Sequence, residues 1–406
     1  MPGQLRRSLT VSADVVASAC AVSRASLGYA PAWSEVIERP TAPLNSRGVL
    51  VGMSGGIDSS VAALLLREQG YAVIGVTLKL WTDVATSKEH SCCSPESAER
   101  ARQVARKLGI PHFTLDVSEL FYDQVVRYFV EGYRDGLTPN PCAKCNTRVK
   151  FRVMAGLGDR LGLAWVATGH YARMIGEPRT LTRALHRSKD QSYVLAEVDP
   201  HLLRRTLFPL GRMAKHQVQQ LAADTTLDTH QAKESQEICF VADDDHRRFL
   251  RERLGELPGT IVDVRGRLLG HHTGTYNFTI GQRKGLGLVS PAPLYVLRID
   301  AAAREVVVGT VSESAVKCVS VGDLTHHRPS SGQDLQLQIR SSGQALKASL
   351  CPYNIHGQDL KELSTLTFVL DEPEQAVAPG QTAVVYEGKQ VVVAGTIMHT
   401  FPQCRA

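Results

Sequence analysis

The sequence predicts an α/β domain with a parallel sheet, followed by a small central domain and a C-terminal antiparallel β-barrel. Between residues 49 and 171, short apolar runs alternate with helical patterns, as a parallel sheet with crossover helices requires. A glycine-rich turn joins the first of these runs to the first helix. From residue 294 to the end, strand-like segments recur about every 8–12 residues with little helical pattern, which is typical of a small barrel.

The length of 406 residues allows two or three domains, because single domains usually stop growing well below this size. We expect a catalytic domain at 48–212, a central domain at 213–290 and the barrel at 291–406. The leader, residues 1–47, suits an organellar transit peptide, an unstructured bacterial extension and an upstream start codon equally well, and we assign it no chemistry. We therefore expect a cytoplasmic protein, or a mitochondrial one if the leader is a transit peptide.

Composition narrows the class of protein further. Hydrophobic residues make up 43% and charged residues 21%, and no apolar run is long enough to span a membrane. The net charge of +6 suits a polyanionic partner, although many solvated surfaces carry a similar excess. Nine cysteines, an odd number without a clear secretion signal, favour thiol chemistry or metal binding over a disulfide scaffold.

The stretch at 49–60, VLVGMSGGIDSS, has the pattern of a phosphate-binding loop. Gly55 and Gly56 allow successive N–H groups to turn toward one anion, and the helix that begins near Asp58 adds its positive end. The lysine of a Walker A loop is missing, so a kinase or GTPase of that type is not expected. The alternative is an ordinary turn between a strand and a helix.

The following segments extend the predicted sheet. We expect further strands at 72–80, 112–117 and 165–168, with helices at 95–108 and 121–133. The fourth strand ends in Gly169, His170 and Tyr171, within the sequence TGHY. Ligands of open α/β sheets bind at the carboxyl ends of the strands, so SGGIDSS and TGHY should share one crevice.

Two cysteine segments lie outside the predicted strands. In TPNPCAKCNTRVKF (138–151), two prolines should hold the chain extended, and Cys142 and Cys145 are spaced so that their sulfurs can converge. Basic residues follow and could help form a thiolate or contact phosphate; the alternative is a zinc half-site. Cys239 lies in ESQEICFV (234–241), where its apolar neighbours alone favour a buried, inert thiol. In the zinc alternative, Cys92 and Cys93 would complete the half-site formed by Cys142 and Cys145. The basic residues that follow these cysteines are Arg148 and Lys150.

Two other segments are polar or rich in glycine. The loop SKDQSYVL (188–195) can reach phosphates or bases, although most such loops are simply solvated. A helix is expected at 213–223, and at 259–287 short β-rich pieces are separated by glycines.

Taken in order, these segments resemble the tRNA-specific 2-thiouridylases, a family with the pyrophosphatase loop of enzymes that adenylate an oxygen atom. The resemblance runs from about residue 52 to the C-terminus and implies an adenine-nucleotide α-hydrolase-like first domain. It implies ATP-dependent 2-thiolation of the tRNA wobble uridine. The segments that carry it are GMSGGIDSS, NPCAKCNTRVKF, TGHYAR, KDQSYVL, ESQEICFV, GHHTGTYNFTIGQRKGLG and APGQTAVVYEG.

The resemblance also assigns roles to single residues. Cys239 would carry a persulfide received from a sulfur-donor relay or cysteine desulfurase, and Cys145 would be the second thiol, which can close a disulfide with Cys239. Asp58 would help to place Mg²⁺. The ATP-binding positions would be Gly52, Met53, Ser54, Gly55, Gly56, Ile57, Asp58 and Ser59 on the phosphate side, with Leu78 and Gly169 on the adenine side. Asn140, Pro141 and Cys142 would lie near the target base, and His170, Lys189, Asp190, Gln191, Arg340, Ser341 and Gln381 would contact tRNA.

The sequence departs from the family pattern at two places. Many members have an aspartate where this chain has Cys142, so Cys142, Cys145 and Cys239 could instead hold three irons of a [4Fe–4S] cluster. We place the persulfide relay above the cluster. Arg340-Ser341 stands where the family tends to have Arg-Tyr, so that an aromatic stacking contact worth about 1–3 kcal/mol would be lost.

Two rival functions share these features. One is an adenylating ligase that acts on a small molecule, and the other is a non-catalytic tRNA-binding or sulfur-carrying protein. The cysteines and the basic charge disfavour the ligase, and the intact SGGIDSS disfavours the non-catalytic protein. We expect a monomer with no membrane contact.

Overall fold

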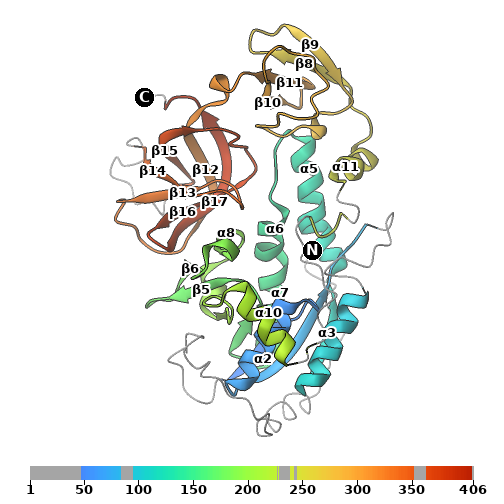
Figure 1. Cartoon of the computed structure of the whole chain (residues 1–406), viewed down its shortest axis with the longest axis vertical. Coiled ribbons are helices and arrows are strands. Elements are labelled where there is room, and N and C mark those ends of the chain that lie inside the picture. The colour runs from blue at the N-terminus through green and yellow to red at the C-terminus, as the bar shows by residue number, and fades with distance from the viewer. Residues whose placement is uncertain are drawn as a thin grey trace.

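A computed structural model describes residues 47–83, 95–225, 227, 238–241, 245–351 and 363–404. Most of the leader, Cys92, Cys93 and residues 234–237 of ESQEICFV lie outside the described residues. Figure 1 shows three bodies, which are an α/β domain, a small sheet and a barrel, with α5 reaching from the first toward the second. Within the described ranges, no helix is both long enough and apolar enough to cross a bilayer.

The first domain is built on a five-stranded parallel sheet, as the alternating pattern predicts. Its central strand is almost fully buried, because helices cover both faces of such a sheet. The last strand was not predicted, since two residues are too few to show a period. In spatial order the strands are β3 (His112–Asp116), β2 (Ala72–Lys79), β1 (Gly48–Gly52), β4 (Trp165–Ala167) and β7 (Thr206–Leu207).

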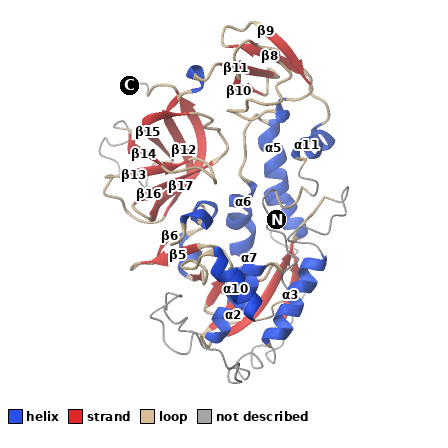
Figure 2. Ribbon diagram, in the orientation of Figure 1, coloured by secondary structure: helices blue, strands red, loops and turns tan. Residues whose placement is uncertain are grey.

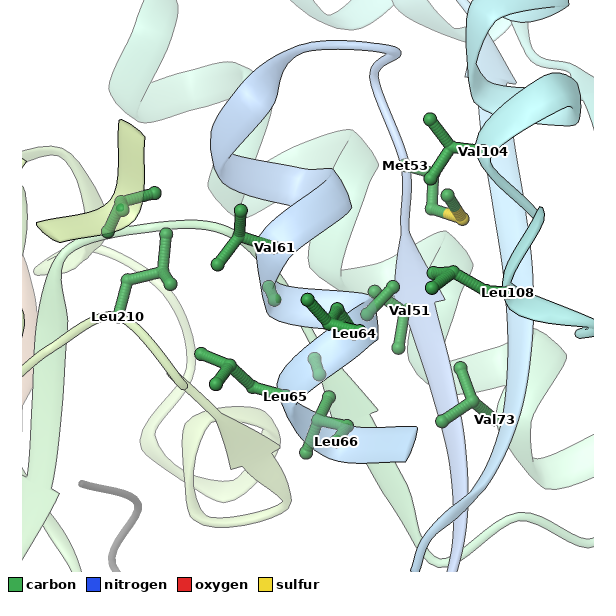
Figure 3. Close-up of a cluster of buried hydrophobic side chains, with 14 of the residues drawn as sticks. Val51, Met53, Val61, Leu64, Leu65, Leu66, Val73, Val104, Leu108 and Leu210 are labelled. Atoms are coloured by element: carbon green, nitrogen blue, oxygen red, sulfur yellow. The ribbon is translucent and has the colours of Figure 1, made fainter. Parts of the chain in front are cut away.

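One hydrophobic core joins the glycine-loop helix to the sheet and to two other helices (Figure 3). The helices are α2 (Ile57–Glu68), α3 (Pro95–Leu108) and α10 (Lys215–Asp224). Val218 and Leu221 of α10 lie in this core beside Val61 and Leu64 of α2. The sequence analysis placed the helix at 213–223 in the central domain; the structure corrects this, because the apolar face of α10 packs on the first domain.

Two helical columns contain wide π turns. One is continuous through α4 (Ser118–Phe121), the π segment Tyr122–Val126 and α5 (Arg127–Arg134). The other runs through α6 (Pro141–Lys144), the π segment Cys145–Lys150 and α7 (Phe151–Arg160). The prediction that both prolines hold 138–151 extended was wrong. Pro141 occupies the first helical position, where its missing N–H costs nothing, and Asn140 caps the helix by accepting from the Ala143 N–H at 3.1 Å.

The central domain contains a four-stranded sheet, and α11 (His246–Leu254) precedes it and lies next to α5 (Figure 2). Its strand order is β10 (Tyr295–Asp300), β11 (Glu305–Gly309), β8 (Gly259–Asp263) and β9 (Leu268–His272). The sequence analysis placed the strands at 295–309 in the barrel; instead, β11 pairs in parallel with β8. That pairing is long-range, so strand spacing alone could not indicate it.

The C-terminal domain is a six-stranded antiparallel barrel, closed by pairing of its first and last strands, β12 and β17. A first-domain hairpin, β5 (Ala172–Ile175) and β6 (Thr180–Arg183), extends this sheet through the Thr182–Gln390 pair. A disulfide joins Cys318 to Cys404. The barrel strands in spatial order are β12 (Val316–His326), β15 (Thr365–Glu374), β14 (Leu346–Leu350), β13 (Leu335–Gln338), β16 (Thr382–Glu387) and β17 (Gln390–Phe401).

Candidate functional site

The glycine loop lies between the end of β1 and the first turn of α2. Gly55 has a φ of +73°, and a Cβ there would overlap the carbonyl oxygen of Ser97 in α3. The Ser54 N–H donates to Ser59 Oγ at 3.1 Å, and this hydroxyl donates to the Gly56 carbonyl at 3.1 Å. The loop is therefore braced from inside, at the positive end of a twelve-residue helix.

The TGHY segment packs directly against this loop. A Cβ on Gly169 would lie 2.7 Å from the backbone nitrogen of Ser59, and the Tyr171 hydroxyl donates to Asp58 Oδ1 at 2.8 Å. SGGIDSS and TGHY therefore lie against each other, as expected, and the crevice that they were predicted to share stays a prediction. Gln191 joins them, because its Oε1 accepts from the Tyr171 N–H at 2.9 Å.

A lysine from α10 completes the surroundings of Asp58. Lys215 Nζ lies 2.9 Å from both carboxylate oxygens, although the two residues are 157 positions apart. The side chains are 15% exposed for Lys215 and 34% exposed for Asp58. Asp58 Oδ1 therefore accepts from Lys215 and Tyr171 together.

The opposite side of the loop is held by a chain of two side chains. Thr77 Oγ1 donates to the Met53 carbonyl at 2.8 Å and lies 2.9 Å from His112 Nε2. Because the threonine proton is already used, His112 Nε2–H is the donor in the second bond. Burial lowers the pKa of His112 to about 4, so the ring is neutral near pH 7. Leu78, the predicted adenine-side position, follows Thr77 in β2.

His170 is only partly buried, after the end of β4, and its ring packs against aromatic side chains. Its Nδ1 lies 2.8 Å from Thr168 Oγ1, and its ring packs against those of Phe151 and Phe208, at centroid distances of 6.2 and 6.5 Å. Burial and, to a smaller extent, the charge of Lys150 lower its pKa to about 3. A contact between His170 and tRNA would thus involve a neutral ring.

The two predicted catalytic cysteines belong to one aromatic and aliphatic cluster. Cys145 is buried within it, and Cys239 is partly buried and packs against it. Phe240 anchors the segment of Cys239, because its ring lies 5.7 Å from that of Phe121 and 5.5 Å from that of Phe129. The composition of ESQEICFV favoured a fully buried thiol, which the partial exposure of Cys239 corrects.

The predicted metal sites find no support in the donor arrangement. Within the ranges that the structure covers, no three His, Cys, Asp or Glu side chains are grouped so that they could hold a metal. Cys142 is exposed at the start of α6, whereas Cys145 is buried one turn later. The thiols offered for a [4Fe–4S] cluster therefore do not form a preassembled ligand set. The zinc alternative depends on cysteines outside the described residues.

A buried polar network joins α6 to the barrel. Lys144, which lies between Cys142 and Cys145 in the sequence, forms an ion pair with Glu197 at 2.5 Å, and the two side chains are 6% and 4% exposed. Lys144 also donates to Thr396 Oγ1 at 3.2 Å, and Thr382 Oγ1 donates to Glu197 Oε1 at 2.6 Å. Asn140 donates to the Thr382 hydroxyl at 3.2 Å. The segment predicted to lie near the target base is thus fixed to the barrel.

The predicted tRNA contacts differ in how accessible they are. Asp190 is turned inward, where its carboxylate pairs with Arg183 at 3.2 Å and is only 6% exposed. Gln381 donates to the Thr138 carbonyl at 3.0 Å, beside the target-base segment. Arg340 pairs with Glu374 at 3.0 Å and remains 46% exposed. Three other predicted positions retain some exposure, namely Lys189, Gln191 and Ser341.

Sequence reasoning missed several of these residues, chiefly Tyr171 as a partner of Asp58, Lys215, Lys144 and Glu197. Each acts through a long-range contact, and its role does not follow from the residues beside it in the sequence. The missing Walker lysine was the one available hint, because a loop without a cation of its own can receive one from another element.

Comparisons with known proteins agree with this geometry. The model of a tRNA methyl transferase HUP domain matches residues 47–243, that of a tRNA methyl transferase PRC-barrel domain matches 247–310, and that of an aminomethyltransferase beta-barrel domain matches 317–397. The second match includes β10 and β11, in line with their pairing in the central sheet.

Relatives cover most of the chain. The tRNA-specific 2-thiouridylase MnmA of Carboxydothermus hydrogenoformans is 43% identical over 366 residues, which is 87% of this chain and 98% of that protein. The bifunctional protein NifU/MnmA of Rubrobacter xylanophilus is 46% identical over 353 residues, which is 86% of this chain and 70% of that protein. The chain therefore belongs to the family of tRNA-specific 2-thiouridylases.

Proposed function

We propose that this protein uses ATP to replace the C2 oxygen of the wobble uridine of tRNA with sulfur. The observation that carries the proposal is that strand β2, which contains the predicted ATP-binding residue Leu78, contacts the same hydrophobic cluster as both cysteines. Leu78, the predicted adenine-side residue, packs against the same hydrophobic cluster that contains Cys145 and borders Cys239. One site can thus serve both nucleotide activation and sulfur transfer.

The first step converts the uridine C2 oxygen, which is a poor leaving group, into part of an adenylate, from which AMP can depart. The uridine C2 oxygen attacks the α-phosphorus of ATP, and pyrophosphate departs. The glycine loop and the positive end of α2 hold the phosphates. Asp58 offers carboxylate oxygens of the kind that Mg²⁺ prefers, and the bound ion would neutralise charge on the departing pyrophosphate.

The second step delivers sulfur. The terminal sulfur of a Cys239 persulfide, loaded by a sulfur-donor relay, attacks C2, and AMP departs with the former carbonyl oxygen. The Cys145 thiolate then attacks Sγ of Cys239 and breaks the sulfur–sulfur bond, which leaves 2-thiouridine and a Cys145–Cys239 disulfide. An external thiol reduces this disulfide. Alternatively, Cys145 attacks the persulfide first and releases hydrosulfide as the nucleophile.

Substrate recognition combines the first domain with the barrel. Asn140, Pro141 and Cys142 lie at the start of α6, where the buried network joins that helix to the barrel. Exposed Arg340 and Ser341 on the barrel and Lys189 on the first domain would contact the tRNA. We propose that the protein acts as a monomer.

The cysteine roles are tested by single substitutions. Cys145→Ser and Cys239→Ser should each abolish 2-thiouridine formation and leave tRNA affinity almost unchanged. Cys351→Ser, which alters a buried thiol of the barrel, is the control and should remain active. Full activity of either site variant would eliminate the relay. Pyrophosphate release that does not depend on tRNA would favour a small-molecule ligase, and unchanged thiolation by Asp58→Ala would favour a non-catalytic protein.

The cluster mechanism is tested separately on protein purified without oxygen. A [4Fe–4S] cluster requires iron and a broad absorbance in the visible blue that disappear when its thiolate ligands are replaced. Iron-free protein with full activity excludes the cluster, whereas activity that tracks iron content excludes the persulfide.

A further inference from the structure

We propose that Lys215 supplies the cation that binds the triphosphate of ATP in the glycine loop. The proposal rests on the proposed function, since it concerns the same nucleotide site. A Walker A loop carries this cation within its own sequence, and SGGIDSS has no lysine. In the fold, a lysine from α10 reaches the first turn of the helix that follows the loop.

The position of Lys215 is fixed by the core. Val218 and Leu221, one and two turns further along α10, lie in the hydrophobic cluster that also holds Val61 and Leu64 of α2. This packing sets the register of the two helices, so that their first turns meet where Lys215 contacts Asp58. The lysine is therefore held beside the loop by buried side chains rather than by its ion pair alone.

The location of Lys215 is electrostatically unfavourable for α10 itself. The residue occupies the first helical position, where the macrodipole is positive, and the first turn of α10 contains no acidic residue. Asp58, in contrast, lies in the first turn of α2, where a carboxylate is stabilised without a lysine. Lys215 and the positive ends of both helices thus lie around Asp58, and this concentration of positive charge favours an anion with several charges.

The ion pair with Asp58 keeps the lysine in place before nucleotide arrives. Both Asp58 oxygens already accept from Lys215, and Oδ1 also accepts from Tyr171. When a nucleotide and its divalent cation enter, Asp58 retains the Tyr171 hydrogen bond and turns its charge toward the cation. The flexible lysine side chain is then released to a phosphate oxygen.

The test measures equilibrium binding without tRNA, so that thiolation is not needed as a readout. ATP, inorganic pyrophosphate and adenosine are titrated into the full-length protein with and without Mg²⁺. Lys215→Met should weaken binding of ATP and pyrophosphate about tenfold or more, equivalent to about 1.4 kcal/mol, and change adenosine binding by less than about twofold. Lys215→Arg should keep more affinity than Lys215→Met. Lys347→Met, at an exposed lysine of β14, is the control and should match the parent protein.

The outcomes separate this inference from the proposed function. An equal loss of adenosine and ATP affinity would make Lys215 merely structural, and unchanged ATP affinity would overturn the proposal. If Lys215→Met does not fold, the double variant Asp58→Asn/Lys215→Met is compared with Asp58→Asn alone, and an equal ATP affinity of these two variants likewise overturns it. Parent protein that binds no ATP contradicts the proposed function itself.

Discussion

The ion pair between Lys144 and Glu197 gives a prediction that can be worked out from the structure. Lys144→Met removes the cation and leaves the Glu197 carboxylate 4% exposed, with the Thr382 hydroxyl as its remaining partner in this network. Breaking a buried pair in this way costs about 3–5 kcal/mol, because an uncompensated charge stays buried. We expect the free energy of unfolding to fall by that amount.

The double variant Lys144→Met/Glu197→Gln should recover much of this loss. It removes both charges, and replacing a whole buried pair is often close to neutral. We expect it to be more stable than Lys144→Met by about 2 kcal/mol or more. Since Lys144 lies between Cys142 and Cys145 in the sequence, we also expect thiolation to slow in the single variant.

Urea unfolding followed by far-UV circular dichroism measures these differences, and proteolysis reports whether the barrel separates from the first domain. The control is Arg127→Met, which breaks an exposed pair with Asp123 whose side chains are 57% and 52% exposed. That control should lose less than about 1 kcal/mol. A Lys144→Met variant that loses no more than the control, or a double variant less stable than Lys144→Met, would refute the reasoning.

Three further predictions follow from the fold. Gly55→Ala should weaken ATP binding, because φ is +73° and the new Cβ would overlap a carbonyl of α3, whereas Gly156→Ala in α7 meets no atom within 4 Å and should bind ATP normally; isothermal titration distinguishes them. Affinity for tRNA should fall steeply as salt is raised, and a flat response in filter binding would contradict a basic contact surface. Burial lowers the pKa values of His112 and His327 to about 4 and that of His170 to about 3, so unfolding takes up protons below pH 6.5. The stability from these groups is present above that pH and is lost toward pH 4, which a series of thermal melts should record as a falling Tm; a constant Tm would contradict it.

The local patterns predicted the first domain well. The alternation of apolar runs and helices placed four strands of the parallel sheet and the glycine loop, because each of these elements is specified by its own residues. The role of Pro141 in the segment 138–151 was predicted wrongly, because proline suits both an extended chain and the first position of a helix. Strand spacing also could not tell β10 and β11 from barrel strands, because the partner of a strand is set by distant residues.

The candidate site was predictable only as far as its motifs reach. SGGIDSS, TGHY and the cysteine segments each carry a recognisable pattern. The fold joins SGGIDSS to TGHY through the Tyr171–Asp58 hydrogen bond, and it gathers the two cysteine segments in one hydrophobic cluster. The contacts that complete the site join Lys215 to Asp58 over 157 positions and Lys144 to Glu197 over 53 positions. Neither lysine stands in a pattern that distinguishes it from a solvated one before folding.

Analysis of modified nucleosides tests the central claim most directly. Purified protein, tRNA that lacks the modification and a persulfide donor are incubated with ATP or with an analogue that cannot be cleaved between its α- and β-phosphates. Mass spectrometry should find 2-thiouridine at the wobble position only with ATP, and none with Cys239→Ser. Thiolation that proceeds equally well with the analogue, or an unmodified wobble uridine after incubation with ATP and a competent donor, would contradict the claim.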